Sequence, residues 1–127
     1  FLVSIAGIAT NLICAFIFYP LLLLCAMSFW GAGFAFTLQQ ILISLFSFAF
    51  EANLVFAVFN LLPIHPLDGY NAIASFLPYE NKFSNFMQRY GSLILIFVIV
   101  LFNRTNIFEY LVSYVGYPIS AFWGLFF

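Results

Sequence analysis

The chain has 127 residues, of which 66% are hydrophobic and 6% charged, and its mean hydropathy is +1.16. A soluble domain carries about 25% charged residues, so this composition excludes a water-facing surface and predicts an all-α polytopic protein embedded in the lipid bilayer. The net charge of −1 argues against a nucleic-acid partner.

The N-terminus lies inside a hydrophobic run and lacks the features of a signal peptide. Phe1 is not a methionine, and neither a basic n-region nor a small-residue cleavage site follows it. We therefore expect the chain to be the C-terminal part of a longer membrane protein. Cys14 and Cys25 would lie about 16 Å apart on one helix, too far for a disulfide.

The first predicted elements are two membrane spans joined by a glycine turn. Residues 1–50 contain no charged side chain, and as one helix they would be about 75 Å long, more than twice the hydrocarbon thickness. The run must fold back, and residues 31–33 (Gly-Ala-Gly) suit a tight turn. We expect spans over 2–29 and 36–60, with Pro20 kinking the first span or ending its regular part.

A few polar side chains interrupt these spans. Gly7 and Asn11 share one helical face, which by itself is typical of helix packing through small residues. Asn53 and Asn60 are two turns apart and share a face that should point into the protein. Glu51 points elsewhere, and its role as a functional, protonated or snorkelling carboxyl stays open.

A proline-rich break follows the second span. Pro63 and Pro66 lack an N–H and disfavour helix in the residue before each, so the sequence predicts an unwound break at 61–67 with residues 62–66 extended. Such backbone must be covered by protein or line a polar cavity at membrane depth. Beyond the break the sequence predicts a short helix over 67–77 and spans over 83–102 and 107–126.

These elements give about four transmembrane helices in one membrane-embedded domain, 1–127. Residues 79–89 form the most polar segment and read as an interfacial loop. Two of the three basic residues, Lys82 and Arg89, lie in it, which predicts that the loop is cytoplasmic.

Asp68, directly after the break, is the nearby residue most suited to chemistry. A carboxylate within a membrane is by default a candidate functional group. The residues alone leave three roles open: a metal ligand, a proton or ion relay, or a cap in the first turn of a helix.

The surrounding pattern is more specific. Asn60, Pro63, Leu67, Asp68 and Gly69 occupy every fixed position of N-x-x-P-x-x-x-L-D-G. This resembles the signature of the site-2 protease family, which are intramembrane zinc metalloproteases, and it stands at the end of a hydrophobic span as in that family.

Two further segments extend the resemblance over essentially the whole chain. Residues 4–11 (SIAGIATN) are similar to the family's A-G-P-x-x-N segment, with Gly7 and Asn11 in place and Ile8 where the family has proline. Downstream, Leu77-Pro78-Tyr79 and Arg89-Tyr90-Gly91 also look like bacterial members.

The resemblance implies a Zn²⁺ ion held by two histidines of an H-E-x-x-H helix and by Asp68. Two histidines and one carboxylate suit catalytic zinc, which leaves a fourth position for water and lowers the pKa of that water toward neutrality by Lewis-acid polarisation. The motif's glutamate is then the general base. The remaining implied roles are catalysis for Asn60, substrate binding for Asn11, Asn53, Pro63 and Pro66, and structural support for Gly7 and Gly69.

The sequence departs from the family in one respect. No H-E-x-x-H occurs in these residues, and His65 is the only histidine. The family's position corresponding to His65 is variable, which makes it a neighbour of the site and not a ligand. Either spans bearing the histidines precede Phe1 in the parent protein, or the chain is a non-catalytic relative.

The leading hypothesis is therefore part of a zinc-dependent intramembrane protease of a bacterial cell membrane. Its substrates would be membrane proteins with a transmembrane helix, cleaved in regulated intramembrane proteolysis, and the chain by itself would be inactive. The alternatives are a pseudoprotease or membrane subunit, and an ion-transport module that uses Asp68 beside a broken helix.

Overall fold

The computed structural model describes residues 1–28, 31–79 and 81–127, and these contain helices without any strand. The helices are α1 (Leu2–Met27), α2 (Phe34–Leu61), α3 (Asp68–Ala74), α4 (Lys82–Arg104) and α5 (Ile107–Gly124). The predicted all-α class is confirmed.

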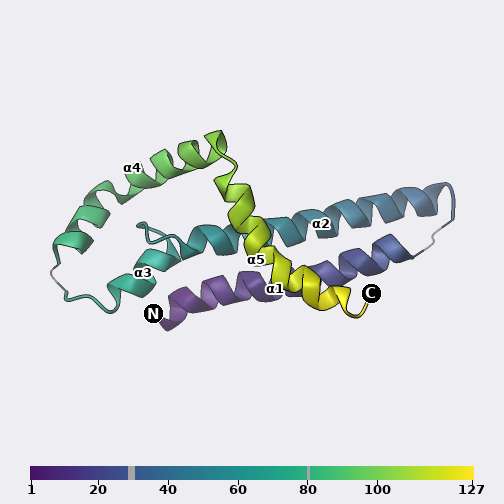
Figure 1. The fold of residues 1–127 in the computed structure, drawn as a ribbon, viewed down its shortest axis with the longest axis horizontal. Helices are drawn as coiled ribbons and strands as arrows, with labels where there is room; N and C mark the ends of the chain where they lie inside the picture. The colour runs from purple at the N-terminus through teal and green to yellow at the C-terminus, as the bar shows by residue number, and fades with distance from the viewer. Residues whose placement is uncertain (29–30, 80) are drawn as a thin grey trace.

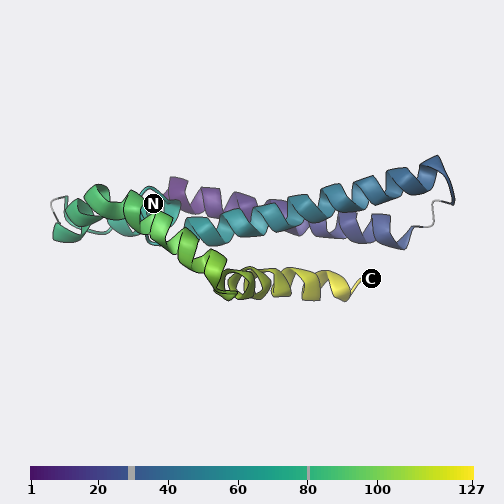
Figure 2. The same cartoon turned by 90° about the horizontal axis from the view of Figure 1, so that it is seen from above.

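α1 and α2 form a long antiparallel hairpin that is the body of the molecule (Figures 1 and 2). Gly31 and Gly33 in the turn both have φ of 76°, a conformation that glycine adopts at little cost. The last residue of the predicted first span, Phe29, lies outside the described residues. Gln39 of α2 links the two helices, because its Nε2 donates to the carbonyls of Cys25 and Ser28, at 2.7 and 2.6 Å. These carbonyls lie at the end of α1, where a helix leaves carbonyls unpaired.

Small and polar side chains form the buried face of α1. Ser4 and Ala15 are the buried residues of α1, and Gly7 and Asn11 lie between them on the same face. The interior is thin, since the described chain buries few apolar residues: Ala15, Leu54, Ala57, Val58, Ile64 and Tyr70. Close contact between small residues is how helices associate in lipid, where burial of apolar area gives no driving force.

Pro20 does not end the regular part of α1, because the helix runs through it to Met27. A proline removes one helical hydrogen bond and leaves the carbonyl four residues earlier without its N–H partner. That carbonyl belongs to Phe16, and it accepts a hydrogen bond of 3.0 Å from the indole N–H of Trp123 in α5. A neighbouring helix therefore satisfies the backbone group that the proline frees.

α5 lies against one face of the hairpin and crosses it (Figures 1 and 2). Gly116 permits the contact, since a Cβ there would come within 2.8 Å of the Leu54 side chain. Among the described residues, α1, α2 and α4 are long and apolar enough to cross a membrane. α5 occupies the predicted fourth span with 18 residues, but it is not among the helices that are apolar enough to cross a membrane, so four spans stay a prediction.

Two predicted boundaries were wrong. α4 begins at Lys82, so most of the predicted 79–89 loop is helix, because the Asn81 side chain accepts a hydrogen bond from the Phe83 N–H and caps it. α3 ends at Ala74 and not at residue 77. The Phe76 N–H then turns back to the Ile73 carbonyl, which ends the helix before Pro78 can.

Candidate functional site

The centre of the candidate site is the segment between α2 and α3, residues 62–67, hereafter the interhelical segment. It is not the single extended stretch that we predicted for 62–66. The Ile64 N–H donates to the Leu62 carbonyl and the Leu67 N–H to the Ile64 carbonyl, both at 2.8 Å. These local turns arise because Pro63 and Pro66 cannot continue a helical ladder.

Gly69 allows α3 to begin directly against the end of α2. A Cβ on Gly69 would lie 2.5 Å from the Leu62 carbonyl oxygen and 2.6 Å from that of Leu61. Real Cβ atoms do not approach backbone oxygens so closely, so this position has room for glycine alone. The contact folds the chain back on itself and places Asp68 beside the last turn of α2.

Asp68 also meets the start of α1. A Cβ on Gly7 would lie 2.5 Å from Oδ2 of Asp68, which means that the half-buried carboxylate rests on the bare backbone of α1 at Gly7. The two sequence segments that suggested a site are therefore in contact. Asp68 lies in the first turn of α3, where a carboxylate is favoured by the helix dipole, so this placement by itself also suits a role at the helix end.

The three asparagines that the sequence singled out lie at different positions along their helices. Asn60 is half-buried in the last turn of α2, next to the interhelical segment. Asn53 lies about 10 Å farther along the axis of α2, and its amide donates to the Ala49 carbonyl of its own helix. Asn11 is half-buried in α1, about 6 Å along the axis from Gly7. Of the three, Asn60 is the one in the turn that leads directly into the interhelical segment.

The side chains of the interhelical segment point in two directions. Pro63 and Pro66 are exposed, whereas Ile64 is buried. The His65 ring meets Tyr70 edge-on, with ring centroids 5.3 Å apart. Its Nδ1 is buried without a hydrogen-bond partner among the described residues.

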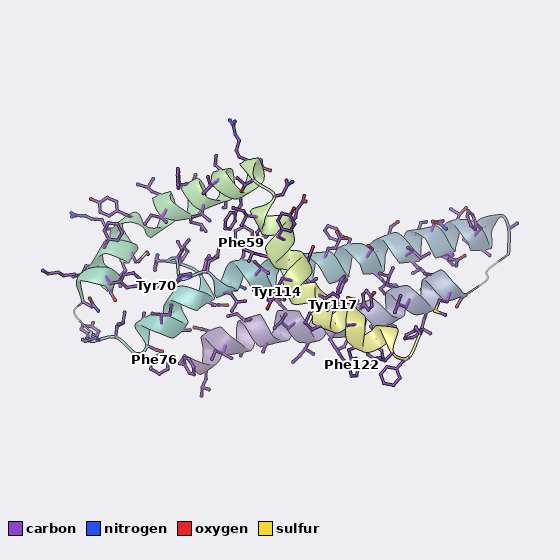
Figure 3. All side chains as sticks on the ribbon, viewed as in Figure 1. Phe59, Tyr70, Phe76, Tyr114, Tyr117 and Phe122 are labelled. Carbon is purple, nitrogen blue, oxygen red and sulfur yellow. The ribbon has the colours of Figure 1, made fainter. Side chains whose placement is uncertain are left out.

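Sequence reasoning missed the residues that cover this segment. Tyr70, labelled on α3 in Figure 3, is buried, and its hydroxyl lies 3.5 Å from the Ser84 carbonyl of α4. A Cβ on Gly91 of α4 would come within 2.8 Å of His65. Gly91 had appeared only within the weak Arg89-Tyr90-Gly91 resemblance. Its two-turn spacing from Ser84 was the available signal for an inward face.

The donor set for a metal is incomplete in the described part of the chain. No group of three His, Cys, Asp or Glu side chains there could hold a metal ion. Asp68 contributes a single carboxylate, which is partly buried in the first turn of α3.

A separate groove of about 610 Å³ lies between α2 and α5. Glu51 and Glu109 both line it, with Ser113 and Ser120 on the α5 side. Asp68 does not line it, so this groove and the motif residues are distinct features of the fold.

The comparisons with known proteins agree with the motif. The family model described as "Peptidase family M50" matches residues 31–102, more than half of the chain. The chain belongs to peptidase family M50. The matched range includes Asp68 and Gly91 but not Gly7, so the contact between Gly7 and Asp68 is an observation independent of that match.

One curated relative is similar over much of the chain. It is the protein named "Putative zinc metalloprotease YwhC" of Bacillus subtilis (strain 168), which is 46% identical over 77 residues, or 61% of this chain. The chain spans about a third of the length of that relative. No solved structure matches the chain significantly. Membership of family M50 and its apolar helices identify an integral membrane protein.

Proposed function

We propose that this chain forms part of a zinc-dependent intramembrane protease that cleaves transmembrane segments of other membrane proteins. One observation carries the proposal. The carboxylate of Asp68, at the aspartate of the L-D-G motif, rests on Gly7 of α1 beside the broken end of α2. Membership of family M50 supports the same reading.

Asp68 would be one of three protein ligands of the zinc. The other ligands would come from polypeptide outside these 127 residues, consistent with a match that covers only 34% of the relative's length. When bound, zinc lowers the pKa of a coordinated water toward neutrality through Lewis-acid polarisation. Gly7 leaves space for the carboxylate, and Gly69 sets where α3 starts, so these two glycines fix the position of Asp68.

Asn60 and the interhelical segment would receive the substrate. A transmembrane helix must unwind before its amide can be attacked, and extended peptides dock on unpaired backbone groups. The carbonyls of Pro63 and Pro66 accept no backbone hydrogen bond from the described residues, and both prolines are exposed. Asn60, one turn away, is placed to hold the substrate or to stabilise the oxyanion with its amide. Asn11 and Asn53, which lie farther along α1 and α2, would contact the substrate helix before it unwinds.

The proposal is tested by cleavage in a bilayer. The natural full-length protein is reconstituted into liposomes with a single-span substrate, and the Asp68→Ala variant is compared with Glu51→Gln, which alters a carboxylate outside the motif. We expect Asp68→Ala to reduce cleavage by at least about 10³-fold, in line with the loss of a group on which catalysis depends. Glu51→Gln should stay within about threefold of wild type. Cleavage by Asp68→Ala at the wild-type rate would refute the proposal.

The same preparation separates the two alternative functions. An ion-transport module predicts cation flux that Asp68→Ala abolishes, in protein without zinc. A pseudoprotease predicts a folded protein that lacks both zinc and cleavage. Either result would replace the proposed function.

A further inference from the structure

α4 covers the candidate site through one narrow face. Ser84 and Gly91 are its buried residues, and their two-turn spacing places them on the same side of the helix. Ser84 accepts from Tyr70 through its carbonyl, and Gly91 lies against His65. The buried face of α4 is thus the face that meets α3 and the interhelical segment.

The contact at Gly91 is closer than any side chain would allow. A Cβ there would lie 2.8 Å from both the Cβ and the carbonyl oxygen of His65, and 3.3 Å from its carbonyl carbon. Contacts below 3.0 Å essentially never occur for a real Cβ. A change of side-chain rotamer cannot relieve them, because these His65 atoms belong to the backbone or are attached directly to it. A larger residue at position 91 must therefore move the interhelical segment or α4.

We infer that Gly91 is a positioning residue for the substrate. It holds the backbone of the interhelical segment in place from the α4 side, while the exposed Pro63 and Pro66 leave the segment open for an unwound peptide. Gly91 acts through His65 and does not touch the substrate. The inference rests on the proposed function, because that function makes the interhelical segment the docking site.

A Gly91 substitution should weaken substrate binding more than it changes the zinc content. Asp68 is located separately by Gly7 and Gly69, whereas the three atoms nearest to a Cβ on Gly91 all belong to His65. A misplacement of about 1 Å can cost about 10²-fold in activity, and an added methyl here requires a shift of several tenths of an ångström. We expect Gly91→Ala to raise the apparent KM about tenfold and to leave kcat and zinc content within about twofold of wild type.

Gly124→Ala is a matched control, because a Cβ on Gly124 meets nothing within 4 Å. Both variants are made in the natural full-length protein, and kcat and apparent KM are measured with a single-span substrate in liposomes. A second measurement follows the affinity of the zinc-depleted protein for the same substrate helix carrying a fluorophore. The affinity should fall about tenfold for Gly91→Ala and stay unchanged for Gly124→Ala.

Two results would overturn the inference: equal behaviour of the two variants, or a loss of zinc or kcat in Gly91→Ala at constant KM. If Gly91→Ala does not fold, His65→Gly tests the same contact from the other side, since it removes the Cβ that packs on Gly91. That variant should also raise KM and keep its zinc, and a wild-type KM would count against the inference. Wild-type protein without zinc or cleavage would refute the proposed function itself, and the binding measurement alone would then decide the role of Gly91.

Discussion

At the scale of single residues, the site depends on close contacts that only glycine permits. Gly7 leaves room for the Asp68 carboxylate, and Gly69 brings α3 against the end of α2. Each contact joins parts of the chain that the sequence places on different elements. The position of the one candidate metal ligand is therefore determined by backbone packing.

Gly7→Ala should displace the Asp68 carboxylate without harming α1. Alanine favours helix by about 1 kcal/mol relative to glycine, whereas the new methyl would lie 2.5 Å from Oδ2 of Asp68. Changes next to metal ligands typically cost about 10–100-fold in metal affinity, and we expect a loss in that range. A zinc titration of the full-length protein measures it, with Gly124→Ala as control, and an unchanged zinc affinity would disprove the contact's role.

The sequence predicted the motif residues but not what surrounds them. Asn60, Asp68 and Gly69 could be singled out because the motif is local, and their roles stay predictions. Gly91 and Tyr70 could not be identified in this way. Their importance depends on where α4 packs after α3 and the connection between the two helices. The turns within the interhelical segment were also missed, since prolines exclude helix without specifying which turn replaces it.

At the scale of helices, a residue of α5 pairs with the backbone carbonyl that Pro20 frees in α1. Pro20 leaves the Phe16 carbonyl free, and Trp123 donates to it. The sequence predicted that Pro20 would kink α1 or end its regular part; an end at Pro20 is wrong, because α1 runs on to Met27, and a kink stays a prediction. The lengths of α1, α2 and α4 were predictable from hydrophobic runs alone, to within a few residues at each end.

The Pro20–Trp123 relation can be tested by a double-mutant cycle. Trp123→Phe should destabilise the protein by about 0.6 kcal/mol beyond lost packing, the mean for interhelical hydrogen bonds in membranes. Pro20→Ala restores an N–H for the Phe16 carbonyl, so Trp123→Phe should cost less in that background. The free energy of unfolding in mixed detergent micelles measures both. An identical cost in the two backgrounds would show that the hydrogen bond contributes nothing to stability.

At the scale of the whole molecule, the antiparallel hairpin places its turn and the candidate site at opposite ends (Figure 1). Residues 31–33 lie at one end, and the interhelical segment and α3 lie at the other with the start of α4. The basic residues Lys82 and Arg89 belong to the second end, so the positive-inside tendency predicts that this end faces the cytoplasm.

Cysteine labelling tests this orientation. In a background of Cys14→Ala and Cys25→Ala, Tyr79→Cys and Ala32→Cys each add one exposed thiol at opposite ends of the hairpin. A membrane-impermeant maleimide added to intact cells should label Ala32→Cys and not Tyr79→Cys, and both should react after permeabilisation. Labelling of Tyr79→Cys alone in intact cells would show that the protein has the opposite orientation.

The central claim is that Asp68 is a zinc ligand, and the zinc content of the purified full-length protein tests it most directly. Wild type and Gly124→Ala should each carry about one zinc per chain, as expected for a catalytic site with three protein ligands. Asp68→Ala should lose most of its zinc while it stays folded and monodisperse. Equal zinc in all three proteins, or none in the wild type, would contradict the claim.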